Sequence, residues 1–210
     1  MTPGRRSPRT AAAPLLGLAL AAAAPAFAEA ELPTWLGACL SDHGERARYH
    51  GELLAAGWSE IPAAGRAEAM LTLADAFLGS NTYAIDWQDP GVRADALEAW
   101  GDFTRDAPLF AQAGAVLHLA SYRSDGPLMA VECWVALPGP DLTEPHLAAG
   151  RADGRLESFG GFVMLSLEWD HSRTQAITLR ALRLDPPEAL APPLAAMDAL
   201  LIVSAFQPSE

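Results

Sequence analysis

Residues 115–137 constrain the fold of this chain more than any other stretch, because they have the pattern of two strands joined by a tight turn. The turn sequence is Ser124-Asp125-Gly126-Pro127, whose glycine can adopt the positive φ that tight hairpin turns require. A period-two alternation predicts a strand with one face on a hydrophobic core. We therefore expect a hairpin here, with the preceding part of the chain packed against its inner face. The apolar set of the second strand is Met129, Val131, Cys133, Val135 and Leu137.

A second hairpin is predicted further along the chain. Residues 162–169 alternate in the same way, and residues 175–184 form the paired strand after a short polar turn. The final apolar run, residues 194–203, is ambiguous between helix and strand. Its alanines favour a helix, whereas the branched residues at its end obscure where that helix would stop. We expect this last element to be a helix.

Three further helices are predicted before the first hairpin. The first runs from the cap residue Asp42 to about Ala56. The second covers residues 64–78, where apolar residues recur at helical spacing. The third begins at Asp89-Pro90, a cap residue followed by proline at the first helical position.

Together these elements predict one α+β domain over residues 29–210. Its antiparallel sheet would have about four strands, arranged as two hairpins, with three N-terminal helices and one C-terminal helix packed on one face. The alternation favours antiparallel pairing, because parallel strands are buried on both faces. Residues 138–161 form a connection rich in proline and glycine, long enough to serve as a lid or a binding loop.

The first 28 residues have the organisation of a secretory signal peptide. Arg5, Arg6 and Arg9 precede an uncharged apolar run at 11–24, and Ala26-Phe27-Ala28 matches the small-residue cleavage pattern. A membrane anchor would need about 20 apolar residues, and the arginine pair lacks the apolar flank expected of a twin-arginine signal. We therefore expect a cleaved leader, and a periplasmic or secreted protein with no stable membrane anchor.

The formal net charge of −12 restricts the partners that the protein can bind. Nucleic acids and anionic membrane surfaces attract clusters of Lys and Arg, and removal of the leader would make the chain still more acidic. Binding to nucleic acid is therefore not expected. An envelope protein or a small molecule remains as the partner to be considered.

The chain has two cysteines, Cys39 and Cys133. In an oxidising compartment an isolated pair usually forms a disulfide, which here would tie the start of the first helix to the second strand of the hairpin. Two buried free thiols are the alternative. Residues 36–39 also have the outline of a lipidation sequence, but they lie too far beyond the apolar leader for that purpose. We predict the Cys39–Cys133 bond.

Catalytic and metal motifs are not evident in the sequence. The five histidines show neither H-x-x-x-H nor H-E-x-x-H spacing, so no metal and no cofactor are expected. His118 and Glu132 fall close together on the two strands of the first hairpin, on the face opposite Cys133. An acid beside an imidazole can act as a general base in a hydrolase, and it can equally be a solvated cross-strand pair. We favour the second interpretation and assign no catalytic residue.

The loop between the second and third helices supplies the remaining candidate site. Tyr83 and Trp87 place bulky aromatic groups where loops are usually polar, so they either plug the core or present a contact patch. We name both as candidate ligand- or partner-binding residues. The favoured hypothesis is a non-catalytic binding domain of the cell envelope; the alternative is a hydrolase that uses His118 and Glu132.

Overall fold

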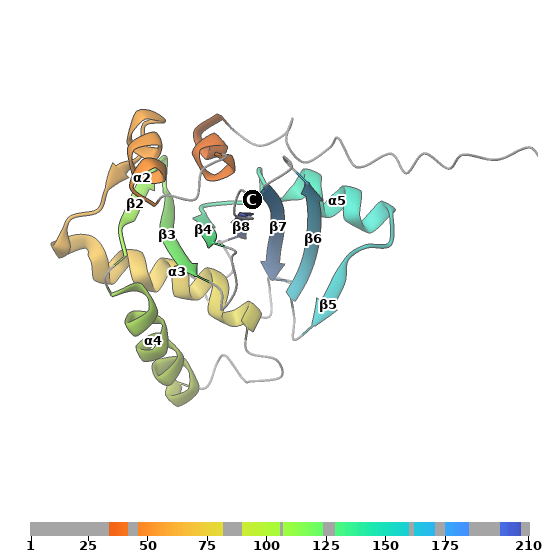
Figure 1. Ribbon diagram of the computed structural model, residues 1–210. Coiled ribbons are helices and arrows are strands. Elements are labelled where there is room, and N and C mark those ends of the chain that lie inside the picture. Colours follow the sequence, from red (N-terminus) through yellow and green to blue (C-terminus); the bar gives the residue numbers. More distant parts are fainter. Residues whose placement is uncertain are drawn as a thin grey trace, which may run out of the picture.

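The strands of the described chain form one antiparallel sheet of eight strands, in the order β1-β2-β3-β4-β8-β7-β6-β5 (Figure 1). The computed structural model describes residues 34–41, 46–81, 90–105, 107–123, 129–159, 162–170, 175–184 and 198–206. The predicted signal peptide lies outside them. The strands are β1 (Ser59–Glu60), β2 (Leu109–Gln112), β3 (Ala115–Arg123), β4 (Met129–Leu137), β5 (Glu157–Phe159), β6 (Phe162–Asp170), β7 (Gln175–Leu184) and β8 (Asp198–Phe206).

Helices cover both faces of this sheet, and not the single face that the sequence predicted. The helical elements are η1 (Thr34–Leu40), α2 (Arg46–Ala55), η2 (Ala63–Gly65), α3 (Arg66–Asn81), α4 (Pro90–Thr104) and α5 (Glu144–Ala152), with η1 and η2 being 3₁₀ helices. The core on one face includes residues of η1, α2 and α5, whereas the core on the other includes residues of α3 and α4. The sheet is thus the middle layer of three.

Both predicted hairpins are present. In the first, β3 pairs with β4 so that Leu119 lies opposite Cys133, and in the second β6 pairs with β7. The predicted turn at residues 124–127 lies outside the described residues. The α+β class and the antiparallel pairing are therefore confirmed.

The predicted C-terminal helix is wrong, because that part of the chain contains the strand β8. β8 lies between the two hairpins, with Ile202 opposite Cys133 of β4 and opposite Leu179 of β7. A central strand covered on both faces needs apolar residues at successive positions. Its sequence consequently lacks the period-two alternation that would have distinguished it from a buried helix.

The predicted count of about four strands is also wrong. Besides β8, the sheet contains β1, β2 and β5, which have two, four and three residues respectively. Strands of this length are too short to display an alternation in sequence. They extend the two outer edges of the sheet, where β1 pairs with β2 and β5 pairs with β6.

The apolar periodicity of residues 64–78 predicts Leu71 on the inner face of α3 and Asp75 on the outer face, and the structure reverses both. Leu73 is completely buried and Asp75 is 6% exposed, whereas Leu71 is 46% exposed. The helix contacts both the sheet and α4. Burial between two partners covers a wider arc of a helix than packing on a sheet alone.

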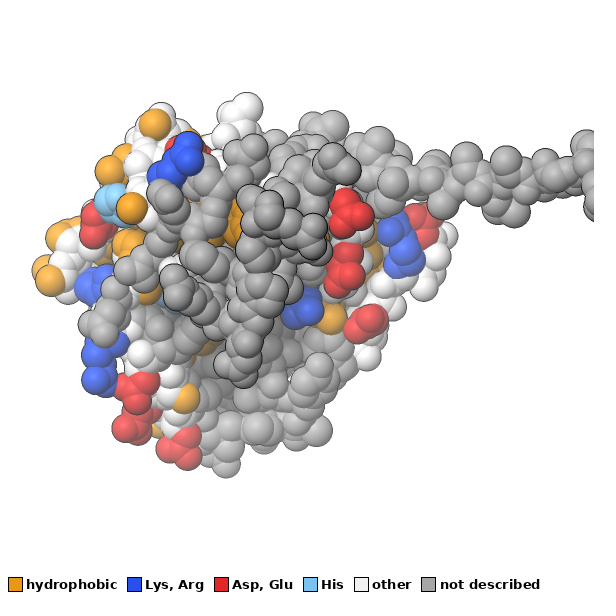
Figure 2. All heavy atoms as spheres, viewed as in Figure 1, with side chains coloured by type: hydrophobic (Ala, Val, Ile, Leu, Met, Phe, Trp, Pro, Cys, Tyr) orange, Lys and Arg blue, Asp and Glu red, His pale blue; other side chains and the backbone are white. Residues whose placement is uncertain are grey.

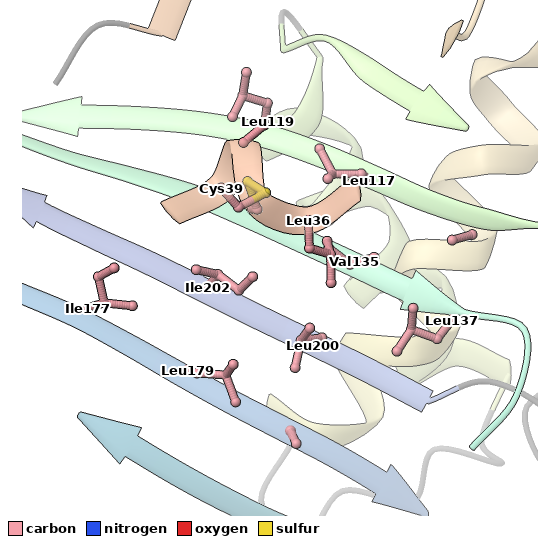
Figure 3. Packing of buried hydrophobic residues seen from close by; sticks show 14 of the residues in the cluster. Leu36, Cys39, Leu117, Leu119, Val135, Leu137, Ile177, Leu179, Leu200 and Ile202 are labelled. Carbon is pink, nitrogen blue, oxygen red and sulfur yellow. A yellow bond between two sulfur atoms is a disulfide. The ribbon is translucent and has the colours of Figure 1, made fainter. Parts of the chain in front are cut away.

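The larger core cluster surrounds the predicted disulfide, which joins Cys39 of η1 to Cys133 of β4 with a Cα–Cα distance of 6.0 Å. Figure 3 shows the side chains around it arranged in rows on β3, β4, β8 and β7, with η1 lying across them. Leu36 of η1, Leu117 of β3 and Ile202 of β8 are completely buried. The bond therefore fixes a short helix onto the middle of the sheet.

Within the described residues, no helix has both the length and the apolar character needed to cross a membrane.

Candidate functional site

The two aromatic residues predicted to bind a partner, Tyr83 and Trp87, lie outside the described residues, so their role stays a prediction. The other predicted loop is mostly described. Residues 138–159 contain α5 and β5, which leaves an irregular segment between β4 and α5. That segment, residues 138–143, contributes to the site described below.

His118 and Glu132 share one face of the first hairpin but are not directly opposite each other. His118 pairs with Trp134 in the strand register, and Glu132 pairs with Ala120. His118 is completely buried and Glu132 is 7% exposed. Trp134 donates a hydrogen bond from Nε1 to Oε2 of Glu132 over 2.8 Å.

Aromatic side chains surround this pair. The ring of Trp100, on α4, lies 6.4 Å from that of His118 and 5.3 Å from that of Trp134, and Phe77 of α3 lies 5.0 Å from Trp134. Such edge-to-face contacts are typical of a packed aromatic core. The arrangement places His118 and Glu132 in the layer between the sheet and α3/α4, away from solvent.

The described surface itself shows charges of both signs. In the view of Figure 2, acidic and basic side chains are interspersed, and hydrophobic side chains gather near the edge that carries α2. The large exposed hydrophobic residues are Leu54 on α2 and Leu71 on α3, which lie on opposite faces of the sheet. Single exposed leucines are ordinary features of protein surfaces.

A groove of about 320 Å³ lies where three distant parts of the chain meet. Apolar side chains provide most of its wall, together with one amide and one carboxylate. A volume near the lower end of the usual range for ligand sites suits a small organic molecule. The lining residues are Trp35, Gln112, Ala113, Ala115, Leu137, Pro138, Gly139, Asp141 and Leu142.

Trp35, on η1, forms the first wall and is held by two contacts with Trp58. The indole Nε1 of Trp58 donates a hydrogen bond to the carbonyl of Trp35 over 2.8 Å. The two rings lie 5.2 Å apart in an edge-to-face arrangement. Because the disulfide at Cys39 fixes the same helix, Trp35 is anchored at a defined place on the groove.

The turn between β2 and β3 forms the second wall. Ala113 has φ of 48° and Gly114 has φ of 83°, so the two-residue turn uses the left-handed region at both positions. Turns of this geometry match the twist of a hairpin, and they favour Asn or Gly at the first position. Alanine there is strained, and the residue lines the groove.

Ala113→Gly is expected to raise the free energy of unfolding by about 0.5–1 kcal/mol, because glycine relieves the left-handed strain of alanine and loses part of this gain to unfolded-state entropy. Urea denaturation measures the change. Ala149→Gly, in α5, is the control and should destabilise by about 1 kcal/mol, because alanine is preferred in a helix. Equal losses in both variants would contradict the strain at Ala113.

Gln112 adds a polar group to the same wall. Its side-chain Nε2 donates a hydrogen bond to the carbonyl of Ala56 over 3.2 Å, which fixes the orientation of the amide. Its Oε1 is buried and accepts no hydrogen bond from the described residues. A buried acceptor without a hydrogen bond costs free energy, so Oε1 of Gln112 is a locally unfavourable feature of this wall.

Residues 138–142 form the third wall, and a polar network behind them holds it in place. Arg183 of β7 donates hydrogen bonds to the carbonyl of Pro140, to the hydroxyl of Thr143 and to the carboxylate of Asp198. Thr143 donates its hydroxyl hydrogen to Asp198. Thr143 is completely buried and Asp198 is 6% exposed, so the network is an internal clamp between the sheet and the groove segment.

Glu144, the first residue of α5, completes this clamp by accepting a hydrogen bond from Arg183. This hydrogen bond lowers the pKa of Glu144 below its ordinary value. A lowered folded-state pKa means that the contact stabilises the fold above the unfolded-state pKa. The contribution is lost as the pH falls through the lowered value.

The described residues contain no group of three or more His, Cys, Asp or Glu placed to hold a metal ion. His50 Nε2 lies 3.0 Å from Oε2 of Glu60. That pair lies at the partly exposed edge formed by α2 and β1. It does not line the groove.

Sequence reasoning did not identify Trp35, Gln112 or Ala113 as site residues. The first lies just past the predicted leader and the others are in a short strand and its turn, so none carries a local signal. Only residues 138–142 fall in a connection that had been predicted to bind. A scan against protein-family models, a search of curated proteins and a search of solved structures each gave no match to this chain.

Proposed function

We propose that this protein is a non-catalytic binding domain of the cell envelope that takes up a small organic molecule in the groove beside Trp35. The observation that supports the proposal is the construction of the groove. Its three walls come from η1, the β2–β3 turn and the segment after β4. Each wall is held separately, by a disulfide-anchored helix, a hairpin and a buried clamp, which favours a site formed before the ligand arrives.

The proposed location rests on two features of different kinds. The sequence begins with a predicted signal peptide, and the described part of the chain contains a disulfide bond. Disulfides persist in oxidising compartments such as the bacterial periplasm. We therefore propose that the protein acts in the periplasm or after secretion.

The catalytic alternative receives less support from the geometry. His118 and Glu132 are buried behind Trp100 and Trp134, on the other face of the sheet from Trp35. Among the described residues that line the groove, Asp141 is the one ionisable side chain. General acid–base catalysis needs its groups within hydrogen-bond reach of a substrate, and the groove supplies no second such group.

Gly139→Phe is the variant that tests the proposed site. A Cβ added at Gly139 would meet no atom within 4 Å, so the new side chain can extend into the groove without a backbone clash. The matched control is Gly51→Phe on α2, where an added Cβ also meets no atom within 4 Å and the residue does not line the groove.

The probe is N-phenyl-1-naphthylamine, a neutral molecule whose fluorescence rises in apolar surroundings. We expect the purified protein to bind it saturably, and Gly139→Phe to weaken that binding at least about tenfold, because the aromatic ring occupies the apolar volume. Gly51→Phe should bind as the native protein does. Unchanged binding in Gly139→Phe, with both variants folded, would show that the groove is not the site.

A further inference from the structure

We infer that the groove selects a small organic cation, namely a primary ammonium that carries a short apolar chain. This inference rests on the proposed function, because it assigns a ligand class to the same site. The charge of the wall, the pairing of the cation behind it and the groups that the wall presents all favour such a ligand.

The first observation is the charge of the lining. Asp141 contributes a carboxylate, and the lining residues in the described part of the chain include no arginine and no histidine. An anionic ligand would meet this carboxylate without a compensating positive charge, whereas a cation would be attracted to it. The charge of the whole chain, −12, acts in the same direction.

The second observation concerns Arg183, the guanidinium group behind residues 138–142. It forms ion pairs with Asp198 at 2.8 Å and with Glu144. Its hydrogen bonds to Thr143 and to the carbonyl of Pro140 further engage the guanidinium. The guanidinium is thus already paired with two carboxylates and offers no free positive charge for an anionic ligand.

The third observation concerns the groups that a ligand would contact. Asp141 is an exposed lining residue, and its carboxylate has only acceptor atoms when ionised. An ammonium group has three donors and no acceptor, which matches a carboxylate. The indole of Trp35 is the type of aromatic ring that attracts cations most strongly when they approach its face.

The apolar lining residues favour a ligand that also carries a hydrocarbon chain. Leu137, Pro138 and Leu142 provide apolar surface beside Trp35 and Asp141. Transfer of each methylene group from water to such a surface contributes about 0.8 kcal/mol. A ligand with a cationic head and a short hydrocarbon chain therefore uses both kinds of surface, which neither a bare metal ion nor a neutral hydrocarbon would do.

Three probes with the same six-carbon chain separate the effect of the head group from that of the chain: hexylammonium, hexanol and hexanoate. Each is titrated into the purified protein while the indole N–H resonance of Trp35 is followed by NMR, after assignment with Trp35→Phe. The test variant is Asp141→Asn. The matched control is Asp95→Asn on α4, an exposed aspartate on the other face of the sheet, which changes the net charge equally.

We expect hexylammonium to bind more tightly than hexanoate. Asp141→Asn should weaken the binding of hexylammonium by about two- to fivefold, as expected for the loss of an exposed ion pair. The affinity for hexanol should be the same in Asp141→Asn as in the native protein. Asp95→Asn should leave the affinities for all three probes unchanged. The preference of the native protein for hexylammonium should decrease as the salt concentration is raised.

Two outcomes overturn the inference and are distinguishable. If Gly139→Phe weakens the binding of all three probes but Asp141→Asn leaves the ratios of their affinities unchanged, the groove binds ligands without selecting cations. If Gly139→Phe changes none of them, the groove is not the site, and the proposed function fails together with the inference.

Discussion

The double variant Cys39→Ala/Cys133→Ala is expected to lose about 4.5 kcal/mol of unfolding free energy. The two cysteines are separated by 94 positions, and the entropy of closing a loop of that length in the unfolded chain gives this magnitude. Both cysteines are 1% exposed, so alanine adds no buried polar group at either position. Urea denaturation without reductant measures the loss, and the slope of the transition should rise because the unfolded chain expands further.

Reductant provides the control for this experiment. Added reductant should destabilise the native protein by a similar amount and leave the double variant unchanged. Two free thiols per chain, titrated in denatured protein that has not been reduced, would show that the bond is absent. The variant should also weaken binding of N-phenyl-1-naphthylamine, because the bond anchors the helix that carries Trp35.

Arg183→Met is expected to cost about 3 kcal/mol of stability at neutral pH. The substitution leaves the carboxylate of Asp198, which is 6% exposed, without its guanidinium partner. Removing one member of a buried ion pair costs about 3–5 kcal/mol, because the remaining charge is desolvated without compensation. The residual hydrogen bond from Thr143 should keep the loss near the lower end of that range.

A second substitution and a matched control make this prediction specific. Adding Asp198→Asn to Arg183→Met should recover most of the loss, since the uncompensated charge is then removed. Arg180→Met, at an exposed arginine of the same strand, should change stability by less than about 0.5 kcal/mol. An additive effect of the two substitutions at 183 and 198 would contradict the coupling.

The same arginine should also affect the response to acid. Arg183 lowers the pKa of Glu144, so the native protein loses the contribution of that contact as the pH falls through the lowered value. Arg183→Met lacks the contact at every pH. The difference in stability between the native protein and the variant should therefore narrow in acid, as measured by urea denaturation across a pH series.

Local patterns in the sequence were sufficient for some parts of the fold and insufficient for others. The two hairpins and three helices were predictable because each carries its own periodicity, and the disulfide was predictable because the chain offers one pair of cysteines. β8 was not predictable in this way. Leu200 and Ile202 pack in the core on one face while Ala199 and Leu201 pack in the core on the other, so no period remains in the sequence.

The candidate groove was largely hidden for a different reason. Trp35, Gln112 and Asp141 are separated by long stretches of sequence and meet only because η1 is fixed to the sheet, and β2 turns directly into β3. The sequence gives no sign that Ala113 is strained, because only its φ of 48° in the structure shows the left-handed conformation. A groove assembled from such remote positions depends on the tertiary structure, and no local sequence motif predicts it.

The central place of β8 has a consequence for how the chain assembles. Hairpins β3–β4 and β6–β7 precede it in sequence, yet neither can join the other until residues 198–206 have been inserted between them. Until then each hairpin presents an open strand edge, which is a risk for aggregation, and completion of the sheet waits on contacts between distant residues. We have proposed that the protein acts in the periplasm or after secretion. Export as an unfolded chain would leave the sheet incomplete during translocation, and the cooperative step of folding would wait until the last strand had reached the far side.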